Sequence, residues 1–252
     1  MTQLPDALAR DTIIECVFEM RFSGGHPSVA ELLPGLLFAK LGKHVQTLNP
    51  LPLGQVPRQF RDQNPQLQYL PTHTLAGPHL RMMFGPHVAG VSFPKPYAGW
   101  KQIQPLIVEC MGAVFETHLT GKPERFALKY VNLLEQGEDE FDLSQTTLNL
   151  GLGKFELRRG GSTFVRAEIE RNGCKSVVDI VSGAKTPASP GNPERSGVLV
   201  SVDVIQDKTG GPAGSVLPEL LELLHMTEKE IFFGLLTETT LEKLGPSYQN
   251  IH

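Results

Sequence analysis

The sequence is poor in cysteine. It has three cysteines in 252 residues, Cys16, Cys110 and Cys174, and no two of them form a C-x-x-C pair. Disulfide-stabilised secreted proteins carry an even set of cysteines, and structural zinc sites need paired ligands, so the sparse pattern argues against both. A chain of this length can bury enough surface to fold without such cross-links.

An excess of positive charge and long apolar runs are missing as well. The chain has 23 Lys and Arg against 27 Asp and Glu, for a net charge of -4, whereas proteins that bind nucleic acids in general usually carry a basic excess. No run approaches the roughly 18–20 apolar residues that a membrane span needs, and the first residues lack the apolar core of a signal peptide. We therefore expect a cytoplasmic protein that does not associate with membranes.

The common catalytic motifs are also missing. The sequence contains no G-x-G-x-x-G or P-loop motif, no H-E-x-x-H motif and no G-x-S-x-G motif, and its eight histidines are scattered. We accordingly expect no metal, no cofactor and no catalytic residues, and a protein that is not an enzyme.

The clearest pattern that is present lies near the N-terminus. Residues 13–22 read IIECVFEMRF, so apolar side chains alternate with charged ones. A period of two is typical of a β-strand with one buried face. The strand should break at Ser23, and a helix capped by Ser28 should follow, with a kink or a division into two helices at Pro34-Gly35.

The segment 42–79 differs from the rest of the chain. It contains six prolines and many Gln and Asn residues, which predicts a long Pro-rich loop with one short strand at 66–70. After this loop the pattern predicts a hairpin of strands 80–84 and 88–93, a helix over 97–118 and a strand at 126–132.

The remaining sequence is rich in strand patterns. Strands are expected at 147–158 and 164–170, joined by a turn at 159–162, and then at 175–181 and 198–205. A helical region should begin with a cap at Ser215, can restart at Thr227, and should stop at Gly245-Pro246.

This order of elements favours an α+β fold. We expect mainly antiparallel sheet with helices packed on one face and a long C-terminal helical region. Residues 1–135 would form an N-terminal β-α-β-β-α-β half that contains the Pro-rich loop 42–79. Residues 136–252 would form a strand-rich half that ends in the helices, and the two halves should make one compact unit.

Three charged residues share one face of the first strand. On that face Arg21 would lie about 7 Å from Glu19, and Glu15 about 14 Å from Glu19. Two carboxylates on one strand face could perform acid–base chemistry, but no nucleophile or metal ligand accompanies them. Pairing with a basic residue of a neighbouring strand, such as Lys129, is the favoured interpretation.

A second charged set lies in the strand-rich half. Four arginines concentrate positive charge there, glutamates dilute it, and the last helical region supplies an acidic counterpart that includes Glu228 and Glu230. Mixed charge of this kind fits a protein-binding surface better than a track for phosphates. The candidate partner-binding residues are therefore Glu15, Glu19, Arg21, Arg158, Arg159, Arg166 and Arg171.

Several short motifs together carry a resemblance. An E-x-x-x-E-x-R-F strand ends at Phe22, a Tyr-x-Gly-Trp helix start begins at Tyr97, and a Lys-Tyr-Val-Asn strand begins at Lys129. With an H-x5-I-F-F-x-x-L-T-E helix from His225, they resemble a sporadically distributed, functionally uncharacterised prokaryotic family of similar length. Leu133 stands where the resemblance leads us to expect a basic residue.

The resemblance implies a setting but supplies no activity and no catalytic residues. A patchy distribution implies genes that travel with mobile elements or defence loci. The leading hypothesis is a non-enzymatic interaction or regulatory module whose partner is a protein encoded nearby: an accessory, immunity or antitoxin-like subunit of a bacterial defence system, CRISPR-associated systems included. The alternatives are a nucleic-acid-binding regulator that uses the basic strands, and an enzyme with carboxylate chemistry at Glu15 and Glu19.

Overall fold

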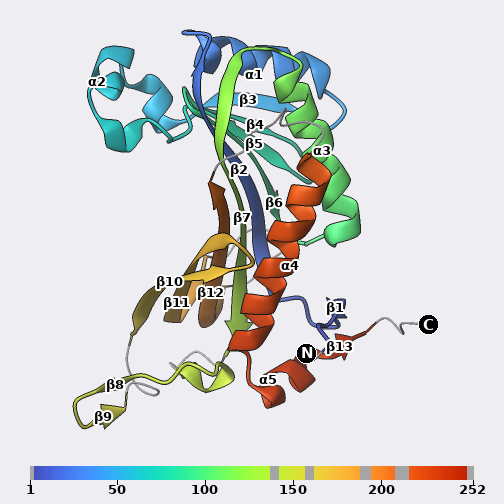
Figure 1. Cartoon of the computed structure of the whole chain (residues 1–252), viewed down its shortest axis with the longest axis vertical. Helices are drawn as coiled ribbons and strands as arrows, with labels where there is room; N and C mark the ends of the chain where they lie inside the picture. The colour runs from blue at the N-terminus through green and yellow to red at the C-terminus, as the bar shows by residue number, and fades with distance from the viewer. Residues whose placement is uncertain (1–2, 137–141, 157–161, 188–193, 208–215, 249–252) are drawn as a thin grey trace. The chain divides into compact units, whose positions relative to one another are not determined.

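The computed structural model describes residues 3–136, 142–156, 162–187, 194–207 and 216–248. They form an α+β fold around a nine-stranded antiparallel sheet (Figure 1), as the order of elements predicts. In spatial order the strands are β10 (Phe164–Arg171), β11 (Cys174–Thr186), β12 (Arg195–Asp207), β7 (Thr120–Glu135), β2 (Ile13–Gly25), β6 (Val88–Pro94), β5 (Arg81–Phe84), β4 (His73–Ala76) and β3 (Thr47–Pro50).

The chain divides into two compact units, and each unit draws on segments that are distant in the sequence. Unit 1 comprises residues 1–14, 129–204 and 225–252, and unit 2 comprises residues 15–128 and 205–224. Several elements, β7 and helix α4 (Leu217–Leu235) among them, contribute residues to both units.

In unit 2 the first strand alternates as its sequence predicts. Every second residue of β2 from Cys16 to Phe22 is completely buried, whereas Glu15, Glu19 and Arg21 lie on the other face and are half-buried. The strand runs on to Gly25, so the break predicted at Ser23 is placed too early.

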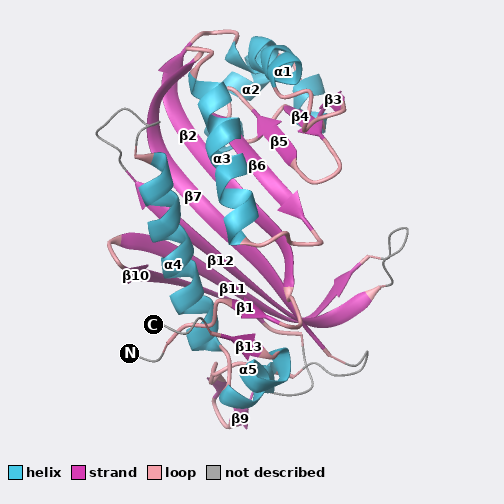
Figure 2. Ribbon diagram, turned by 90° about the vertical axis from the view of Figure 1, so that its right-hand side faces the viewer, coloured by secondary structure: helices cyan, strands magenta, loops and turns pink. Residues whose placement is uncertain are grey.

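The buried face of β2 continues across its neighbours. Phe18 lies opposite Val91, Val91 opposite Met82, and Met82 opposite Leu75, and all four side chains are completely buried. Helices α1 (Val29–Lys40) and α3 (Trp100–Phe115) cover this face of unit 2 (Figure 2). Cross-strand apolar pairs under two amphipathic helices make the core of this unit.

Helix α1 is continuous through its proline. The predicted division at Pro34-Gly35 is wrong, because Pro34 lies inside one twelve-residue helix. A proline removes one backbone hydrogen bond, and the helix accepts that loss at Pro34, which is buried like Leu33 and Leu37. Ser28 occupies the N-cap position as predicted, although its side chain makes no capping hydrogen bond.

The Pro-rich segment 42–79 contains more regular structure than its composition predicts. The strand predicted at 66–70 is wrong, since Pro65 begins a short 3₁₀ helix and the side chain of Asn64 accepts a hydrogen bond from the Gln66 backbone. The residues on either side join the sheet instead, because β4 pairs with β5 and β3 pairs with β4. The segment contains β3, η1 (Pro52–Gln55), α2 (Arg58–Asp62), η2 (Pro65–Leu67) and β4.

In unit 1, β10 and β11 form a long hairpin. Its turn is Asn172-Gly173, with φ of 52° and 74°, which is the positive-φ conformation that two-residue hairpin turns require. The predicted pairing of 147–158 with 164–170 is therefore wrong, because β10 pairs with β11, and the predicted turn falls largely outside the described residues. Strands β8 (Gly151–Leu152) and β9 (Phe155–Glu156) pair only with each other.

The last part of the chain forms α4 (Leu217–Leu235), α5 (Glu238–Leu244) and a two-residue strand. The proposed restart at Thr227 is wrong, since α4 runs through that residue and α5 begins after Thr237, whose side chain caps it. Gly245 ends α5 with a φ of 66°, as predicted, whereas Ser215 lies outside the described residues. The final strand, β13 (Pro246–Ser247), pairs with β1 (Ala7–Leu8), and η3 (Leu143–Gln145) precedes β8.

In the part of the chain that is described, none of the helices combines the length and the apolar character needed to cross a lipid bilayer.

Candidate functional site

The charged row of β2 contains an ion pair within its own strand. Arg21 Nε lies 2.7 Å from Glu19 Oε1, and both side chains are about three-tenths exposed. The guanidinium also lies 4.6 Å from the ring centroid of Tyr69, which comes from the Pro-rich segment. Residues two apart on a strand share a face, so the partner of Glu19 is its neighbour Arg21.

This arrangement fixes Arg21 between a carboxylate and an aromatic ring. The edge of Tyr69 in turn meets His87, with ring centroids 6.4 Å apart. A cation held by a ring and a carboxylate loses little further freedom when it meets a second molecule. The Glu19 carboxylate is thereby engaged by a strong donor.

The second set of candidate residues does not gather into one site. Arg158 and Arg159 lie outside the described residues. Arg166 and Arg171 both lie on β10, but they are an odd number of residues apart and therefore project from opposite faces of the strand. The structure thus brings Glu15, Glu19 and Arg21 together on one strand and separates Arg166 from Arg171.

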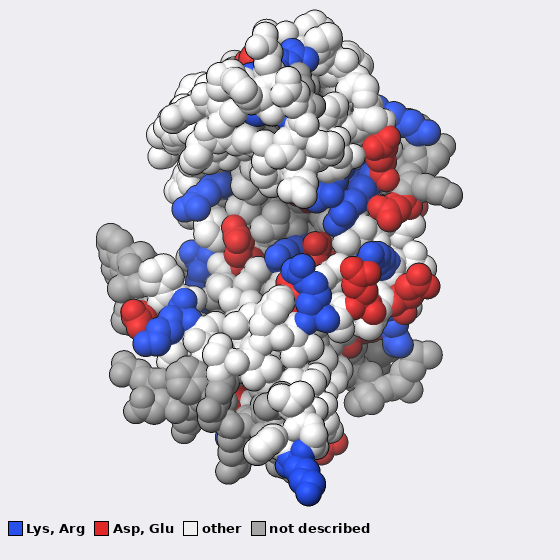
Figure 3. All heavy atoms as spheres, turned by 90° about the vertical axis from the view of Figure 1, so that its left-hand side faces the viewer, with Lys and Arg blue, Asp and Glu red and all other residues white. Residues whose placement is uncertain are grey.

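Carboxylates neutralise the cations of the β10–β11 hairpin. Arg166 donates two hydrogen bonds to Asp179, at 2.7 and 2.8 Å, and these bonds lower the pKa of that carboxyl. Arg171 donates to Glu230 at 2.9 Å, and Lys175 pairs with Glu168 at 2.7 Å. On the face drawn in Figure 3, basic and acidic side chains are likewise interspersed, and that face shows no broad patch of a single charge sign.

Unit 1 also contains a buried polar cluster that the sequence patterns did not predict as a set. The Tyr130 hydroxyl and His225 Nδ1 are 3.1 Å apart, and both side chains are buried. Three residues further along the same helix, Glu228 is 4% exposed, and its Oε1 has no hydrogen-bond partner among the described residues.

Burial decides the charge of these two groups. It raises the pKa of Glu228 to about 8 and lowers the pKa of His225 to about 3, and in both cases the neutral form is favoured because a low-dielectric interior penalises charge. Near neutral pH the cluster therefore consists of a protonated carboxyl and a neutral imidazole.

The position of Glu228 could have been predicted from helical spacing. Leu217, Leu221 and Leu224 are buried, and Glu228 follows Leu224 by four residues, so it continues the same stripe of α4. The sequence prediction that placed Glu228 with the other acidic residues of this helix did not take this helical spacing into account.

The hairpin turn also contacts this helix. The side chain of Asn172 donates hydrogen bonds to Thr227 at 3.1 Å and to Glu230 at 3.3 Å.

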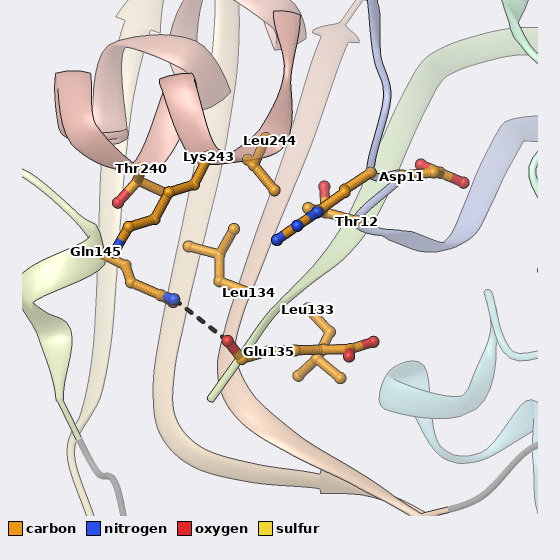
Figure 4. Close-up of a pocket in the computed structure, with 10 residues that line it drawn as sticks. Asp11, Thr12, Leu133, Leu134, Glu135, Gln145, Thr240, Lys243 and Leu244 are labelled. Carbon is orange, nitrogen blue, oxygen red and sulfur yellow. Dashed lines mark hydrogen bonds between the residues drawn. The ribbon is translucent and has the colours of Figure 1, made fainter. Parts of the chain in front are cut away.

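A pocket of about 460 Å³ lies in unit 1, where the residues before β2 meet α5 and the end of β7 (Figure 4). Backbone hydrogen bonds join its walls, from Leu133 to Thr12 at 2.8 Å and from Arg10 to Leu244 at 3.0 Å. The Gln145 side chain donates to the carbonyl of Glu135 at 3.2 Å. The lining residues are Arg10, Asp11, Thr12, Leu133, Leu134, Glu135, Gln145, Thr240, Lys243 and Leu244.

The two carboxylates of this pocket already have partners. Asp11 accepts a hydrogen bond from the Ile13 backbone at 3.0 Å, and Glu135 accepts one from Arg195 at 2.8 Å. Arg10 and Lys243 supply cationic groups that could bind a small anion. The pocket thus combines two cationic groups with two carboxylates that already accept hydrogen bonds.

The remaining reactive groups are buried or dispersed. All three cysteines are buried, and burial raises the pKa of Cys110 to about 12 and also raises that of Cys174, so both thiols stay protonated. Among the described residues, no three His, Cys, Asp or Glu side chains lie close enough together to hold a metal ion.

Comparisons with known proteins add no relative: no protein-family model matches the chain, and no curated protein matches its sequence.

Proposed function

We propose that this protein is a non-enzymatic protein-interaction module. The observation that carries the proposal is helix α1, which is apolar on its outer side as well as on its buried side. A surface helix normally presents polar residues to water, and an apolar outer stripe is typical of a surface that another protein covers.

The outer stripe of α1 follows helical spacing. Leu32 and Leu36 are four residues apart and are 45% and 50% exposed, and Gly35 and Ala39 continue the same side. A Cβ atom built on Gly35 would meet nothing within 4 Å. Two leucines beside small residues can accept the apolar side of a partner helix at close range.

The charged surfaces support a protein partner over a nucleic acid. Phosphate binding needs cations that are free to replace counterions, and Arg166, Arg171 and Lys175 each pair with a carboxylate of the same chain. The engaged state of Glu19 likewise gives less support to carboxylate catalysis on β2.

The setting of this interaction rests on the family resemblance described above. On that basis the partner is the product of a neighbouring gene, and the module acts as an accessory, immunity or antitoxin-like subunit in a defence or mobile-element system, for which CRISPR-associated systems are one candidate. This assignment is by analogy and does not follow from the geometry.

A matched pair of variants tests the proposal. Leu36→Glu places a charge on the α1 stripe, whereas Leu223→Glu makes the same change at a 39% exposed leucine of α4, in the same unit. Each neighbouring gene product is co-expressed with the chain, and the affinity of any complex is measured by calorimetry. We expect Leu36→Glu to weaken binding at least about tenfold, because a charge must be desolvated, and Leu223→Glu to leave it unchanged.

Two results would overturn the proposal. One is the absence of any complex with the neighbouring gene products, together with turnover of a nucleotide or an ester by the purified protein. The other is a complex that both variants bind as tightly as the unmodified chain does.

A further inference from the structure

We propose that two copies of this chain pair through strand β10, antiparallel about a two-fold axis that places Ala167 opposite Ala167 of the second copy. This contact goes beyond the proposed function, because it uses an edge of unit 1 and no residue of the α1 stripe.

Strand β10 is an exposed edge. It lies at one end of the strand order and is eight residues long, and every residue except Val165 is exposed. Sheets usually protect such edges with prolines, bulges or short strands. The opposite end follows that rule, since β3 has four residues and ends at Pro50. The long edge of β10 has only charged side chains as protection, and these are of both signs, so they can pair with a second copy of the same strand.

The register with β11 shows which backbone groups are free. The Ser182 backbone N–H donates to the Thr163 carbonyl at 3.0 Å, and the Thr163 N–H donates to the Ser182 side chain at 2.8 Å, so Thr163 faces β11. Along an antiparallel strand this direction alternates. The N–H and C=O groups of residues 164, 166, 168 and 170 consequently point away from the sheet and can bond a second strand.

Charge selects one register for that second strand. Within the chain Arg166 pairs with Asp179 and Glu168 pairs with Lys175, and both the arginine and the glutamate are exposed beside these partners. With Ala167 on the axis, Arg166 also lies opposite Glu168 of the second copy, and Glu168 lies opposite its Arg166. A shift by two residues in one direction places Arg166 opposite Arg166, and in the other direction it places Glu168 opposite Glu168. Opposite charges in directly facing positions stabilise a pair of strands, and like charges destabilise it.

The other face of β10 is complementary in the same register. Val165 would lie opposite Ile169 of the second copy, with Ala167 between the two such pairs. Ile169 is 40% exposed, and within the chain these residues lie opposite buried positions of β11, among them Val178 and Ile180. Pairing would extend an apolar surface that ends abruptly at the edge.

The test exchanges charges between two forms of the full-length chain. Arg166→Glu makes both facing positions acidic, and Glu168→Arg makes both basic, so each variant repels itself. In an equimolar mixture every facing pair is again of opposite sign. Sedimentation over about a hundredfold range of concentration, with native mass spectrometry of the mixture, should show a wild-type dimer, dimerisation weakened about tenfold or more in each variant, and a heterodimer on mixing.

A cysteine scan reports the register directly. Ala167→Cys should form an intermolecular disulfide on oxidation, because facing residues at a non-hydrogen-bonded position lie within bonding range. Val165→Cys alone should not form one, but it should cross-link to Ile169→Cys when the two variants are mixed. The native cysteines are buried and do not compete.

Three results would overturn the inference. They are a wild-type chain that stays monomeric over the whole concentration range, a dimer that neither charge variant weakens, and cross-linking of Val165→Cys alone as efficient as that of Ala167→Cys.

Discussion

Among the described residues, the buried carboxyl and imidazole groups lie in unit 1, whereas both units also contain apolar side chains and a few buried polar ones. In unit 2, the buried residues of β2, α1 and α3 are apolar. In unit 1, β7 and α4 bring Tyr130, Asn132, His225 and Glu228 into the interior, and Asn132 Nδ2 and Glu228 Oε1 have no hydrogen-bond partner among the described residues. The stability of unit 2 should accordingly depend on packed volume, whereas that of unit 1 should depend on protonation and hydrogen bonding.

Removing packed volume from unit 2 should have the largest effect. Phe18 is completely buried, and its ring stacks on Phe126 with centroids 5.9 Å apart. Phe18→Ala should lower the free energy of unfolding by about 3–5 kcal/mol, because a cavity replaces the ring, and the loss should be the same at acidic and alkaline pH. Denaturant unfolding at several pH values measures both quantities.

The matched control is an exposed phenylalanine of the same unit. Phe38 is 38% exposed on α1, and Phe38→Ala should cost less than about 1 kcal/mol. A loss at Phe18 no larger than that at Phe38 would contradict the packing account of unit 2.

The polar interior of unit 1 should make stability depend on pH. The pKa of Glu228 rises from 4.5 to about 8 on folding, so the folded chain binds more protons than the unfolded chain between these values, and stability falls as pH rises. The pKa of His225 falls from 6.5 to about 3, which has the opposite sign over its own range. The two effects oppose each other between pH 4.5 and 6.5, and Glu228 acts alone from pH 6.5 to 8.

Glu228→Gln should remove the alkaline slope. In the unmodified chain, Glu228 should reduce stability by about 2 kcal/mol from pH 6.5 to 8, whereas the variant should be nearly flat over that range. Glu219 is exposed on the same helix, so Glu219→Gln should keep the original slope. Denaturant unfolding at closely spaced pH values measures how the free energy of unfolding changes with pH. An unchanged slope in Glu228→Gln would show that the Glu228 carboxyl does not cause it.

Much of the fold was predictable because strand alternation is a local signal. The period of two in residues 13–22 predicts both the strand and its buried face, and the hairpin of β5 and β6 follows from its turn residues. The Asn172-Gly173 turn is an equally local signal for the β10–β11 hairpin, although the sequence prediction used only the turn at 159–162. Strands and turns that are determined by residues close in the sequence can thus be predicted from it.

Elements that depend on distant partners were not recoverable in this way. β3 and β4 lie in a Pro-rich segment with little periodicity, and they are strands because β4 pairs with β5 and β3 pairs with β4. The same holds for the candidate site, since neither the contact of Arg21 with Tyr69 nor that of Tyr130 with His225 leaves a local pattern. Glu228 is an intermediate case, because its helical position predicts burial while its charge predicts exposure.

A smaller effect should come from the hydroxyl of Tyr130. Tyr130→Phe removes the group that lies 3.1 Å from His225 Nδ1 and leaves the ring in place. The loss should be about 1–2 kcal/mol, because a buried polar atom loses a partner. Tyr69→Phe in unit 2 provides the matched control: the ring keeps its contact with Arg21, and stability should change by less than about 0.5 kcal/mol. An equal loss of unfolding free energy in both variants would contradict the proposed dependence of unit 1 on buried hydrogen bonds.

The smallest effect should be a gain in stability on the outer side of α1. Gly35 lies within a helix, and a Cβ added there meets nothing within 4 Å, so Gly35→Ala should stabilise the chain by about 0.5–1 kcal/mol through reduced backbone entropy of the unfolded state. Gly234 in α4 has the same open surroundings, and Gly234→Ala should give a similar gain. Thermal unfolding of both variants measures the gains.

Binding then separates these two glycines. If α1 docks a partner helix closely, the added methyl group of Gly35→Ala should weaken that complex, whereas Gly234→Ala should leave it unaffected. Gly35 would then serve close contact with the partner at the expense of the stability of the free chain. Gly35→Ala combining higher stability with undiminished binding would therefore show that the partner does not contact this part of the stripe.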